Sequence, residues 1–523
     1  MTMPRAAYFF GPSGPLPGDV CAAVAARARE QVVAIRGPAG SAGSVRPLKL
    51  EGVLPEGAMT VTDHTTPENT SEAKDSGTGS PAAGPDRTAE APTAHEAATE
   101  PAPGTESPHS RHARHPRRGR GRPRHRRGPS HQNEDSMRGG GRQREPGELL
   151  GILEVLPSGS GFVRRAADGY VPGKNDIYVG SRLIHRFGLR TGDELAGIVG
   201  RRPRNGKSPP LRFLDQVNGL PPDSAARRPD FNRLSAMHPR EQLKLECGRF
   251  HAGEPDMTNR VVDLFCPMGK GQRAMIVAPA KAGKTTILQA VAEGVEKNHP
   301  ECELIILLVD ERPEEVTEME MCGFGEVIAS TFDLTPERHC QVAEMTLARA
   351  RRRVEAGKDV VIILDSITRL ARAHNTVEEG SGRTLSGGLD ASSLEKPKRF
   401  LGSARLIKED QGGGSLTIIA TALVDTGSRM DQVIFEEFKG TGNSELVLSR
   451  ELADRRIYPA IDLRASATRK EELLLSPEAL RVSRAMRRQL SSSLPAEAMD
   501  ELLRVMRQTE TNDELITRAL ERL

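Results

Sequence analysis

Residues 278–285 combine the side chains and the spacing of a phosphate-binding loop. They read Ala-Pro-Ala-Lys-Ala-Gly-Lys-Thr. The apolar run at 274–277 predicts a strand before them and the pattern at 286–296 predicts a helix after them, so backbone N–H groups would point at bound phosphate. Lys284 would place a charge beside the outer phosphates, and the Thr285 hydroxyl would ligate magnesium. The alternative is an accidental Gly-Lys-Thr turn, because the first position is alanine where the pattern has glycine.

Acidic residues follow two further apolar runs. The run at 305–309 ends in Asp310-Glu311-Arg312, and Asp365 comes directly after 360–364. At the carboxyl ends of strands beside a phosphate loop, Asp365 would help to hold magnesium, and Glu311 would orient or deprotonate an attacking water. A lone acid at such a position is as readily a helix cap or a surface charge. Two of them downstream of one loop favour hydrolysis of a nucleoside triphosphate.

Elements that can position these residues occupy 249–523. Apolar runs at 274–278, 304–309, 360–364 and 416–422 alternate with helical segments. Parallel strands that are buried on both faces have this pattern. We therefore predict an α/β domain with the phosphate loop on its first central strand.

Residues 147–222 have a different sequence pattern, in which short runs of alternating apolar residues are separated by Gly, Pro and Asn. Five short strands in this length predict an OB-type barrel, whose open face commonly binds single-stranded nucleic acid. The candidate contacts are Phe162, Arg164, Asp176 and Tyr178. For Phe162 alone, a place in the barrel core is the stronger alternative. A connector at 223–248 would join the barrel to the α/β domain.

The amino-terminal part differs from both domains. Residues 1–110 are rich in Pro, Ala, Thr, Ser, Gly and Glu, which predicts disorder, and 1–58 differ enough from the segment that begins at Met59 to raise the hypothesis that translation starts there. Residues 111–146 form an arginine-rich arm. Nine arginines and no acid lie between 111 and 127, so the net charge of +3 leaves 3 − 9 = −6 for the remainder. The arm suits non-specific attraction to nucleic acid, and a solvated linker is the alternative.

The cysteines and the apolar segments exclude other classes of protein. Six cysteines are scattered without a Cys-x-x-Cys pair, which argues against a zinc site or a disulfide framework. No segment has the length and apolarity of a membrane span, and no secretory signal is evident. We expect a cytoplasmic protein without a membrane partner.

Two long motifs carry a resemblance to a known family. The stretch DERPEEVTEM at 310–319 and the stretch VIILDSITRLAR at 361–372 closely resemble bacterial transcription termination factor Rho, as do FKGTGNSELVLSR and ATRKEELL further on. The resemblance covers 147–523. It implies a RecA-like hexameric ring ATPase that uses ATP and Mg²⁺, loads on pyrimidine-rich nascent RNA, translocates 5′ to 3′ and acts on the RNA polymerase elongation complex to terminate transcription.

The resemblance also implies roles for individual residues. The catalytic set would be Lys284, Glu311, Asp365 and Arg469, with Arg469 reaching a neighbouring subunit's ATP; on its own, Arg469 is better explained as a surface charge. Thr285 and Asp365 would hold the metal. ATP would contact Gly269, Lys270, Gly271, Gln272, Arg273, Ala274, Lys281, Ala282, Gly283, Lys284, Thr285, Thr286, Arg312, Arg456 and Tyr458. Primary RNA contacts would be Gly159, Ser160, Gly161, Phe162, Val163, Arg164, Asp176, Ile177 and Tyr178. Secondary contacts would be Arg383 and Arg429 in two channel loops.

The barrel departs from the family's pattern. Ser160-Gly161-Phe162 stands where Phe-Gly-Phe is usual, and the later edge reads Lys-Ser-Pro-Pro at 207–210. Each lost stacking platform is worth ~1–3 kcal/mol per base, and the arginine arm is a candidate for offsetting the loss. Two other functions stay open at this point. One is a different hexameric ATPase of the rotary type, and the other is an ATP-gated RNA-binding protein without termination activity.

Overall fold

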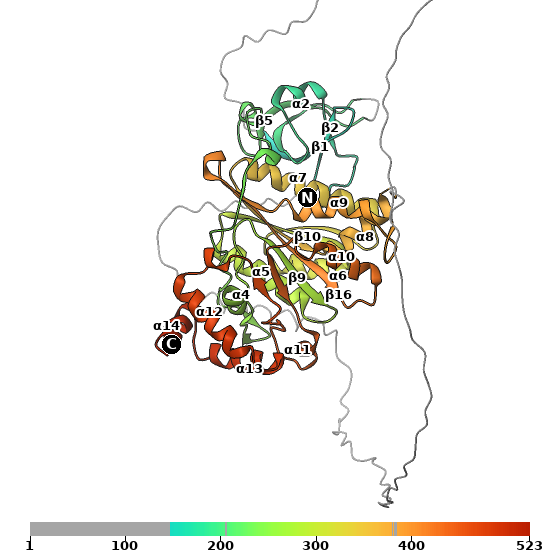
Figure 1. Ribbon diagram of the computed structural model, residues 1–523. Helices are drawn as coiled ribbons and strands as arrows, with labels where there is room; N and C mark the ends of the chain where they lie inside the picture. The colour runs from blue at the N-terminus through green and yellow to red at the C-terminus, as the bar shows by residue number, and fades with distance from the viewer. Residues whose placement is uncertain (1–146, 204–206, 379, 381–383, 523) are drawn as a thin grey trace, which may run out of the picture. The chain divides into compact units, whose positions relative to one another are not determined.

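The computed structural model describes residues 147–203, 207–378, 380 and 384–522. The predicted disordered segment and the arginine arm lie outside these ranges. The described chain contains a five-stranded barrel and a larger α/β domain, which confirms the predicted fold class (Figure 1). No described helix combines the length and the apolar character needed to cross a membrane.

The barrel strands are β1 (Glu148–Val155), β2 (Gly161–Arg164), β3 (Ile177–Val179), β4 (Glu194–Val199) and β5 (Leu211–Val217), in the spatial order β3-β2-β1-β4-β5. A parallel bridge between Tyr178 and Pro210 joins the outer strands β3 and β5 and closes the barrel. Inward side chains such as Leu153, Val163 and Leu195 form its core. Helix α2 (Ser181–Phe187) follows β3, and the short helix α3 (Pro222–Ala225) follows β5.

The α/β domain is built on one large sheet in the order β11-β10-β12-β16-β9-β17-β18. Its parallel strands are β9 (Arg273–Pro279), β10 (Cys302–Glu311), β11 (Glu326–Thr331), β12 (Asp359–Asp365), β16 (Ser415–Val424) and β17 (Ser444–Val447). The antiparallel strands β18 (Ala467–Thr468), β15 (Arg405–Ile407) and β6 (Ala236–Met237) extend it. Strand β6 and Leu243 come from the segment predicted as a connector, and Leu243 is fully buried in the core of this domain.

Successive residues of the central strands face two different helical layers. Ile276, Ile306 and Ile363 pack with α4 (Thr258–Phe265), α5 (Lys284–Asn298) and α6 (Pro313–Cys322). Met275, Leu307 and Ile362 pack with the opposite layer, which comprises α7 (Pro336–Glu355), α8 (Ile367–Val377), α9 (Glu395–Leu401) and α10 (Arg429–Phe438). Both faces of the strands are therefore apolar, as the continuous hydrophobic runs predict.

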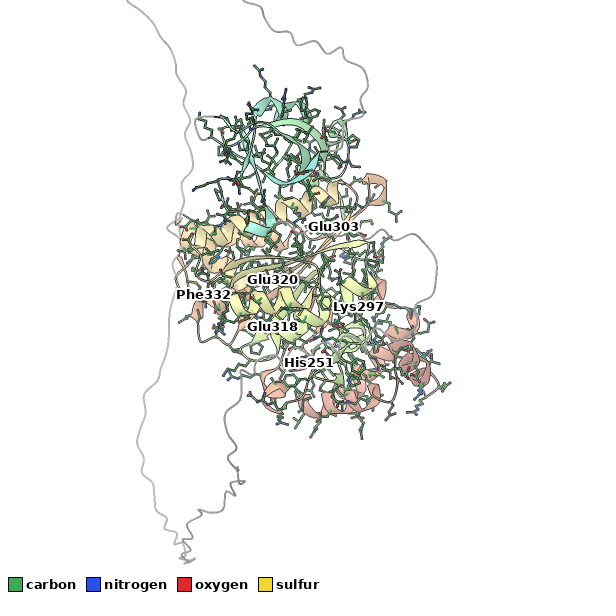
Figure 2. All side chains as sticks on the ribbon, turned by 180° about the vertical axis from the view of Figure 1, so that it is seen from behind. His251, Lys297, Glu303, Glu318, Glu320 and Phe332 are labelled. Atoms are coloured by element: carbon green, nitrogen blue, oxygen red, sulfur yellow. The ribbon has the colours of Figure 1, made fainter. Side chains whose placement is uncertain are left out.

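Polar side chains tie the first layer together at its outer surface. Glu318 on α6 accepts a hydrogen bond from Gln289 on α5, at 2.9 Å. Figure 2 shows Glu318 and Glu320 on α6, with Lys297 near the end of α5. The last four helices of the described chain follow later in the sequence: α11 (Arg450–Asp454), α12 (Pro477–Leu490), α13 (Pro495–Met506) and α14 (Asn512–Leu520). A short hairpin, β7 (Phe250–His251) and β8 (Glu254–Pro255), precedes α4, and another, β13 (Thr384–Leu385) and β14 (Leu389–Asp390), follows α8.

Candidate nucleotide and RNA sites

The phosphate loop lies where the sequence predicts it, between β9 and α5. Gly283 adopts φ = 89° immediately before the first helical residue, and Lys281 adopts φ = 63°. Left-handed conformations at these two positions turn the chain tightly. Gly283, the residue just before α5, adopts this conformation without the steric cost that a side chain would add. The N–H groups of the first turn of α5 have no intrahelical acceptor, so they form an anion-binding end beneath the loop.

Lys284, Glu311 and Asp365 meet at the carboxyl edge of the sheet. The Nζ atom of Lys284 lies 2.8 Å from Oε1 of Glu311 and 2.6 Å from Oδ2 of Asp365. Strands β10 and β12 are neighbours, and they bring both carboxylates to the same edge. Glu311 and Asp365 are 1% and 3% exposed, and Thr421 donates a 2.6 Å hydrogen bond to Oδ1 of Asp365. One ammonium group is thus shared by two buried carboxylates.

Burial and mutual repulsion shift the pKa values of this group. Burial raises the pKa of Glu311, and the nearby Asp365 carboxylate raises it further, to about 7. Burial opposes the charged form of Lys284, but Asp365 and Glu311 outweigh it and raise the pKa of Lys284. The lysine therefore stays charged, while Glu311 can take up a proton near neutral pH.

Arg369 also belongs to this site, although no role is predicted for it from the sequence. Its Nη2 atom lies 3.3 Å from Oε2 of Glu311, and its Nη1 atom contacts the backbone carbonyl of Asp310. Asp310 adopts φ = 58° at the end of β10. Helix α8 starts two residues after Asp365, so its first turn lies at the carboxyl edge of the sheet. A basic residue in that turn is a signal that could have been used.

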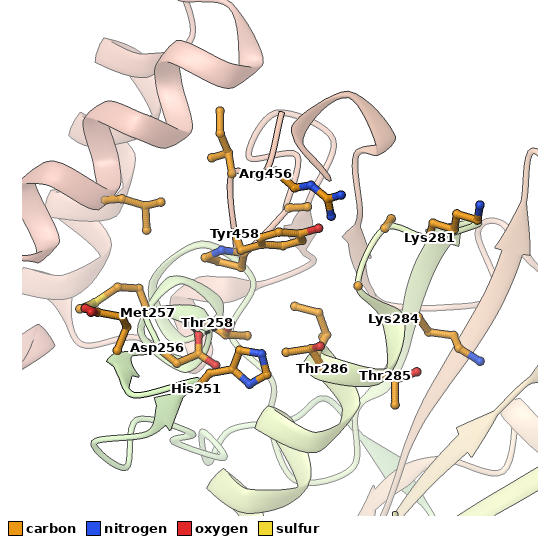
Figure 3. Close-up of a pocket in the computed structure, with 18 of the residues that line it drawn as sticks. His251, Asp256, Met257, Thr258, Lys281, Lys284, Thr285, Thr286, Arg456 and Tyr458 are labelled. Carbon is orange, nitrogen blue, oxygen red and sulfur yellow. Dashed lines mark hydrogen bonds between the residues drawn. The ribbon is translucent and has the colours of Figure 1, made fainter. Parts of the chain in front are cut away.

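A cavity of about 850 Å³ opens above the phosphate loop. Lys281, Arg456 and Tyr458 line it together with Lys284, Thr285 and Thr286 (Figure 3). Arg312 also lines the cavity. The ring of Tyr458 lies beside the loop, since a Cβ atom added to Gly283 would be 3.7 Å from it. Several further lining residues come from segments distant in sequence, and no sequence pattern predicts them: His251, Asp256, Thr258, Asp500 and Arg507.

Two sets of predicted nucleotide contacts lie elsewhere. Residues 269–274 precede or begin β9, whereas the phosphate loop follows its other end, and none of them lines the cavity. Seven residues of strand span about 20 Å, so these residues do not reach a nucleotide on the loop of the same chain. Arg469 lies at the same edge of the sheet as residues 269–274, opposite the phosphate loop. Its backbone N–H donates to the carbonyl of Asn443, and the side chain of Asn443 accepts from the N–H of Arg273. The arginine finger stays a prediction about a second subunit.

The barrel brings several predicted RNA residues to one face. Phe162 pairs with Tyr178 across β2 and β3, and their ring centroids are 5.7 Å apart. Phe162 is half-buried outside the barrel core, and Tyr178 is exposed. The Arg164 side chain is only 7% exposed, and it pairs with Glu154 and Asp176.

The other predicted primary contacts divide into two groups. Val163 and Ile177 point into the barrel core, so only their backbone can meet a ligand. Gly159 and Ser160 lie just before β2, which begins at Gly161, and the Ser160 hydroxyl lies 3.0 Å from that of Ser158.

The two predicted channel loops lie together. A cavity of about 470 Å³ is lined by Asn375, Gly387 and Arg429, and Arg429 is exposed at the start of α10. A Cβ atom added to Gly387 would be 2.8 Å from the backbone nitrogen of Met430, so the loops approach closely. Arg372 of α8 pairs with Asp431 of α10 at 2.5 and 2.7 Å. Arg383 lies outside the described residues.

Two family models match different parts of the chain. The model of the Rho termination factor, RNA-binding domain, matches residues 149–223. The model of the ATP synthase alpha/beta family, nucleotide-binding domain, matches residues 258–468. A solved structure of an ATPase from the type III secretion system of pathogenic bacteria is 25% identical, with a TM-score of 0.42 over 61% of this chain and 85% of that one.

Curated relatives match the chain at higher identity. The transcription termination factor Rho of Gemmatimonas aurantiaca is 54% identical over 71% of this chain and 50% of its own length. Those of Pseudomonas aeruginosa and Aquifex aeolicus are 53% and 52% identical over 70% of this chain, covering 86% and 84% of their own lengths. The chain thus spans half of the first relative and most of the other two.

Proposed function

The chain belongs to the transcription termination factor Rho family, and we propose that it is an RNA-dependent ATPase that translocates 5′ to 3′ along nascent RNA and releases transcripts from RNA polymerase. The observation that carries this proposal is the group of Lys284, Glu311 and Asp365 at the phosphate loop, in a chain whose barrel also matches an RNA-binding domain. The match of the barrel to an RNA-binding domain favours this function over that of a rotary-type ATPase. Nascent RNA as substrate places the action in the cytoplasm.

In this proposal the γ-phosphate of ATP takes the position between Lys284 and the carboxylates. Lys284 then neutralises phosphate charge, which releases Glu311 to act as the base that orients the attacking water. Arg369, 3.3 Å from Glu311, holds that carboxylate in place. Tyr458 lies against the adenine, and Arg312 and Arg456 approach the phosphates from the cavity wall.

Magnesium fits the donors at this site. The Thr285 hydroxyl and the Asp365 carboxylate are hard oxygen ligands beside the anion-binding end of α5, and such ligands suit Mg²⁺ when phosphate oxygens supply the others. When bound, the ion would neutralise charge that develops on the phosphates. No three His, Cys, Asp or Glu side chains cluster as a metal site within the described ranges, so the nucleotide would supply several of the ligands.

A chain of contacts can connect hydrolysis to RNA. Asp365 ends β12, and α8 follows it directly and carries both Arg369 and Arg372. Arg372 pairs with the buried Asp431 of α10, whose first residue is Arg429. A change at the γ-phosphate would therefore move α8 and with it the loop that presents Arg429 to RNA. In a hexamer, Arg469 would complete the neighbouring site.

The test is an ATPase assay with and without cytidine-rich RNA, followed by release of an RNA–DNA duplex. The proposal requires RNA to stimulate hydrolysis and hydrolysis to drive release. RNA binding that responds to ATP without duplex release would instead indicate an ATP-gated RNA-binding protein.

A further inference from the structure

The aromatic face of the barrel spans β2 and β3. Phe162 and Tyr178 are directly paired, so their side chains leave the sheet on the same side. Their rings meet edge to face, with 67° between the planes. Tyr178 is 38% exposed, which leaves part of its surface open for a base.

Strand β5 continues this face. Tyr178 bridges Pro210 in parallel, and its N–H donates to the carbonyl of Pro209 at 2.9 Å. The pairing of β4 with β5 passes from Phe213 to Leu211, so Arg212 is the extra residue of a β-bulge. Leu211 points into the core and is 5% exposed, whereas Arg212 is exposed and so lies on the outer surface of the barrel, as Tyr178 does. Arg212 therefore lies two residues beyond Pro210, the residue that bridges Tyr178, which is at most about 7 Å along β5.

Arg212 is available to an external anion. It is exposed, its guanidinium lies 5.4 Å from the ring centroid of Phe213, and it forms no ion pair with any residue that the structure describes. Arg164, by contrast, is buried and held by two carboxylates. The charge of Arg164 is already compensated within the barrel, whereas that of Arg212 faces solvent.

We propose that Arg212 binds a phosphate of single-stranded RNA whose bases stack on Phe162 and Tyr178, an inference that rests on the proposed RNA-binding function. Ser160 leaves this face with one stacking platform fewer than the family pattern. A cation on the third strand compensates for part of that loss, because each phosphate that it neutralises releases condensed counterions. The RNA path then crosses β2, β3 and β5.

The inference is tested with the full-length protein, without ATP, by filter binding of oligocytidylate RNA over a series of salt concentrations. Arg212→Ala should bind about fivefold more weakly at low salt, and the slope of log K against log salt should fall in magnitude by about 0.7, as expected for one lost phosphate contact on a single strand. Arg212→Lys should restore most of the slope. Arg186→Ala is the matched control, because Arg186 is also exposed and also lies over the next residue, at 4.9 Å from the ring of Phe187.

Several outcomes would overturn the inference. Wild-type affinity and slope for Arg212→Ala, with binding lost in Tyr178→Ala, would leave RNA binding intact and remove Arg212 from it. Equal losses in Arg212→Ala and Arg186→Ala would show a general charge effect. If polyglutamate competed as well as RNA for Arg212, the partner would be an acidic protein. If the wild-type protein bound no RNA, the proposed function itself would fail.

Discussion

Replacing Glu311 by glutamine separates catalysis from binding and from folding. The substitution keeps the size of the side chain and one oxygen that can accept from Lys284, which now lies 2.8 Å from Oε1. It removes the proton acceptor that the proposed mechanism needs. A positioned base contributes ~10²–10⁴ in rate, so RNA-stimulated turnover should fall by that factor, or by about 3–5 kcal/mol of transition-state stabilisation.

The stability of the variant should change much less than its turnover. The amide would turn an N–H group toward Arg369, 3.3 Å away, at a cost of about 1–3 kcal/mol. Against this, glutamine relieves the burial of a charge whose pKa rises from 4.5 to about 7, which is on the order of 3 kcal/mol. The two effects oppose each other, so we expect a net change within about 2 kcal/mol.

Single-turnover hydrolysis, equilibrium binding of a fluorescent ATP analogue and urea unfolding measure the three quantities. Glu314→Gln is the control, because Glu314 is an exposed acid in the first turn of α6, close in sequence to the same site. Turnover within about threefold of wild type in Glu311→Gln would refute the assignment of the base. Loss of ATP binding would instead assign Glu311 to binding.

Four further predictions concern other parts of the site. Since a base must be ionised, turnover should decline as the pH falls through about 7, the raised pKa of Glu311, and a pH–rate profile with an acid limb only near 4.5 would contradict this. Tyr458→Ala should raise the KM for ATP by about 5- to 150-fold with kcat nearly unchanged, because stacking on a base is worth ~1–3 kcal/mol; steady-state kinetics measure this, and an unchanged KM would remove Tyr458 from the adenine site. Asp431→Asn, which weakens the pair with Arg372, should reduce RNA stimulation of the ATPase about tenfold and spare basal hydrolysis; equal loss of both rates would indicate a structural role. Arg228→Met should lower the free energy of unfolding by about 3–5 kcal/mol, because it removes the guanidinium that pairs with the fully buried carboxylate of Asp193; Glu355 keeps its pairs with Arg190 and Arg352, and a change under 1 kcal/mol in urea would contradict the prediction.

Local sequence patterns predict those parts of the fold and of the site that depend on one contiguous segment or on the direction of neighbouring strands. The phosphate loop needs one contiguous octet between a strand and a helix. Glu311 and Asp365 could be placed together because the carboxyl ends of neighbouring parallel strands share an edge of the sheet. The five strands of the barrel followed from alternation between turn residues.

Other parts depend on contacts between distant segments. The cavity receives Asp256 from the segment between β8 and α4, and Arg507 from the residue that follows α13, and no local pattern pairs them. The place of Arg369 in the first turn of α8 is predictable from sequence, but its contacts with Glu311 and the Asp310 carbonyl depend on how a different strand ends. Strand direction alone, in contrast, could have placed residues 269–273 at the edge opposite the loop, since they precede the strand that the loop follows.

RNA-coupled ATP hydrolysis is tested most simply by measuring hydrolysis and the release of an RNA–DNA duplex in one reaction with cytidine-rich RNA. We predict that RNA stimulates hydrolysis, that release requires ATP, and that Glu311→Gln abolishes both. Duplex release that persists in Glu311→Gln, or hydrolysis that ignores RNA, would contradict the proposed function.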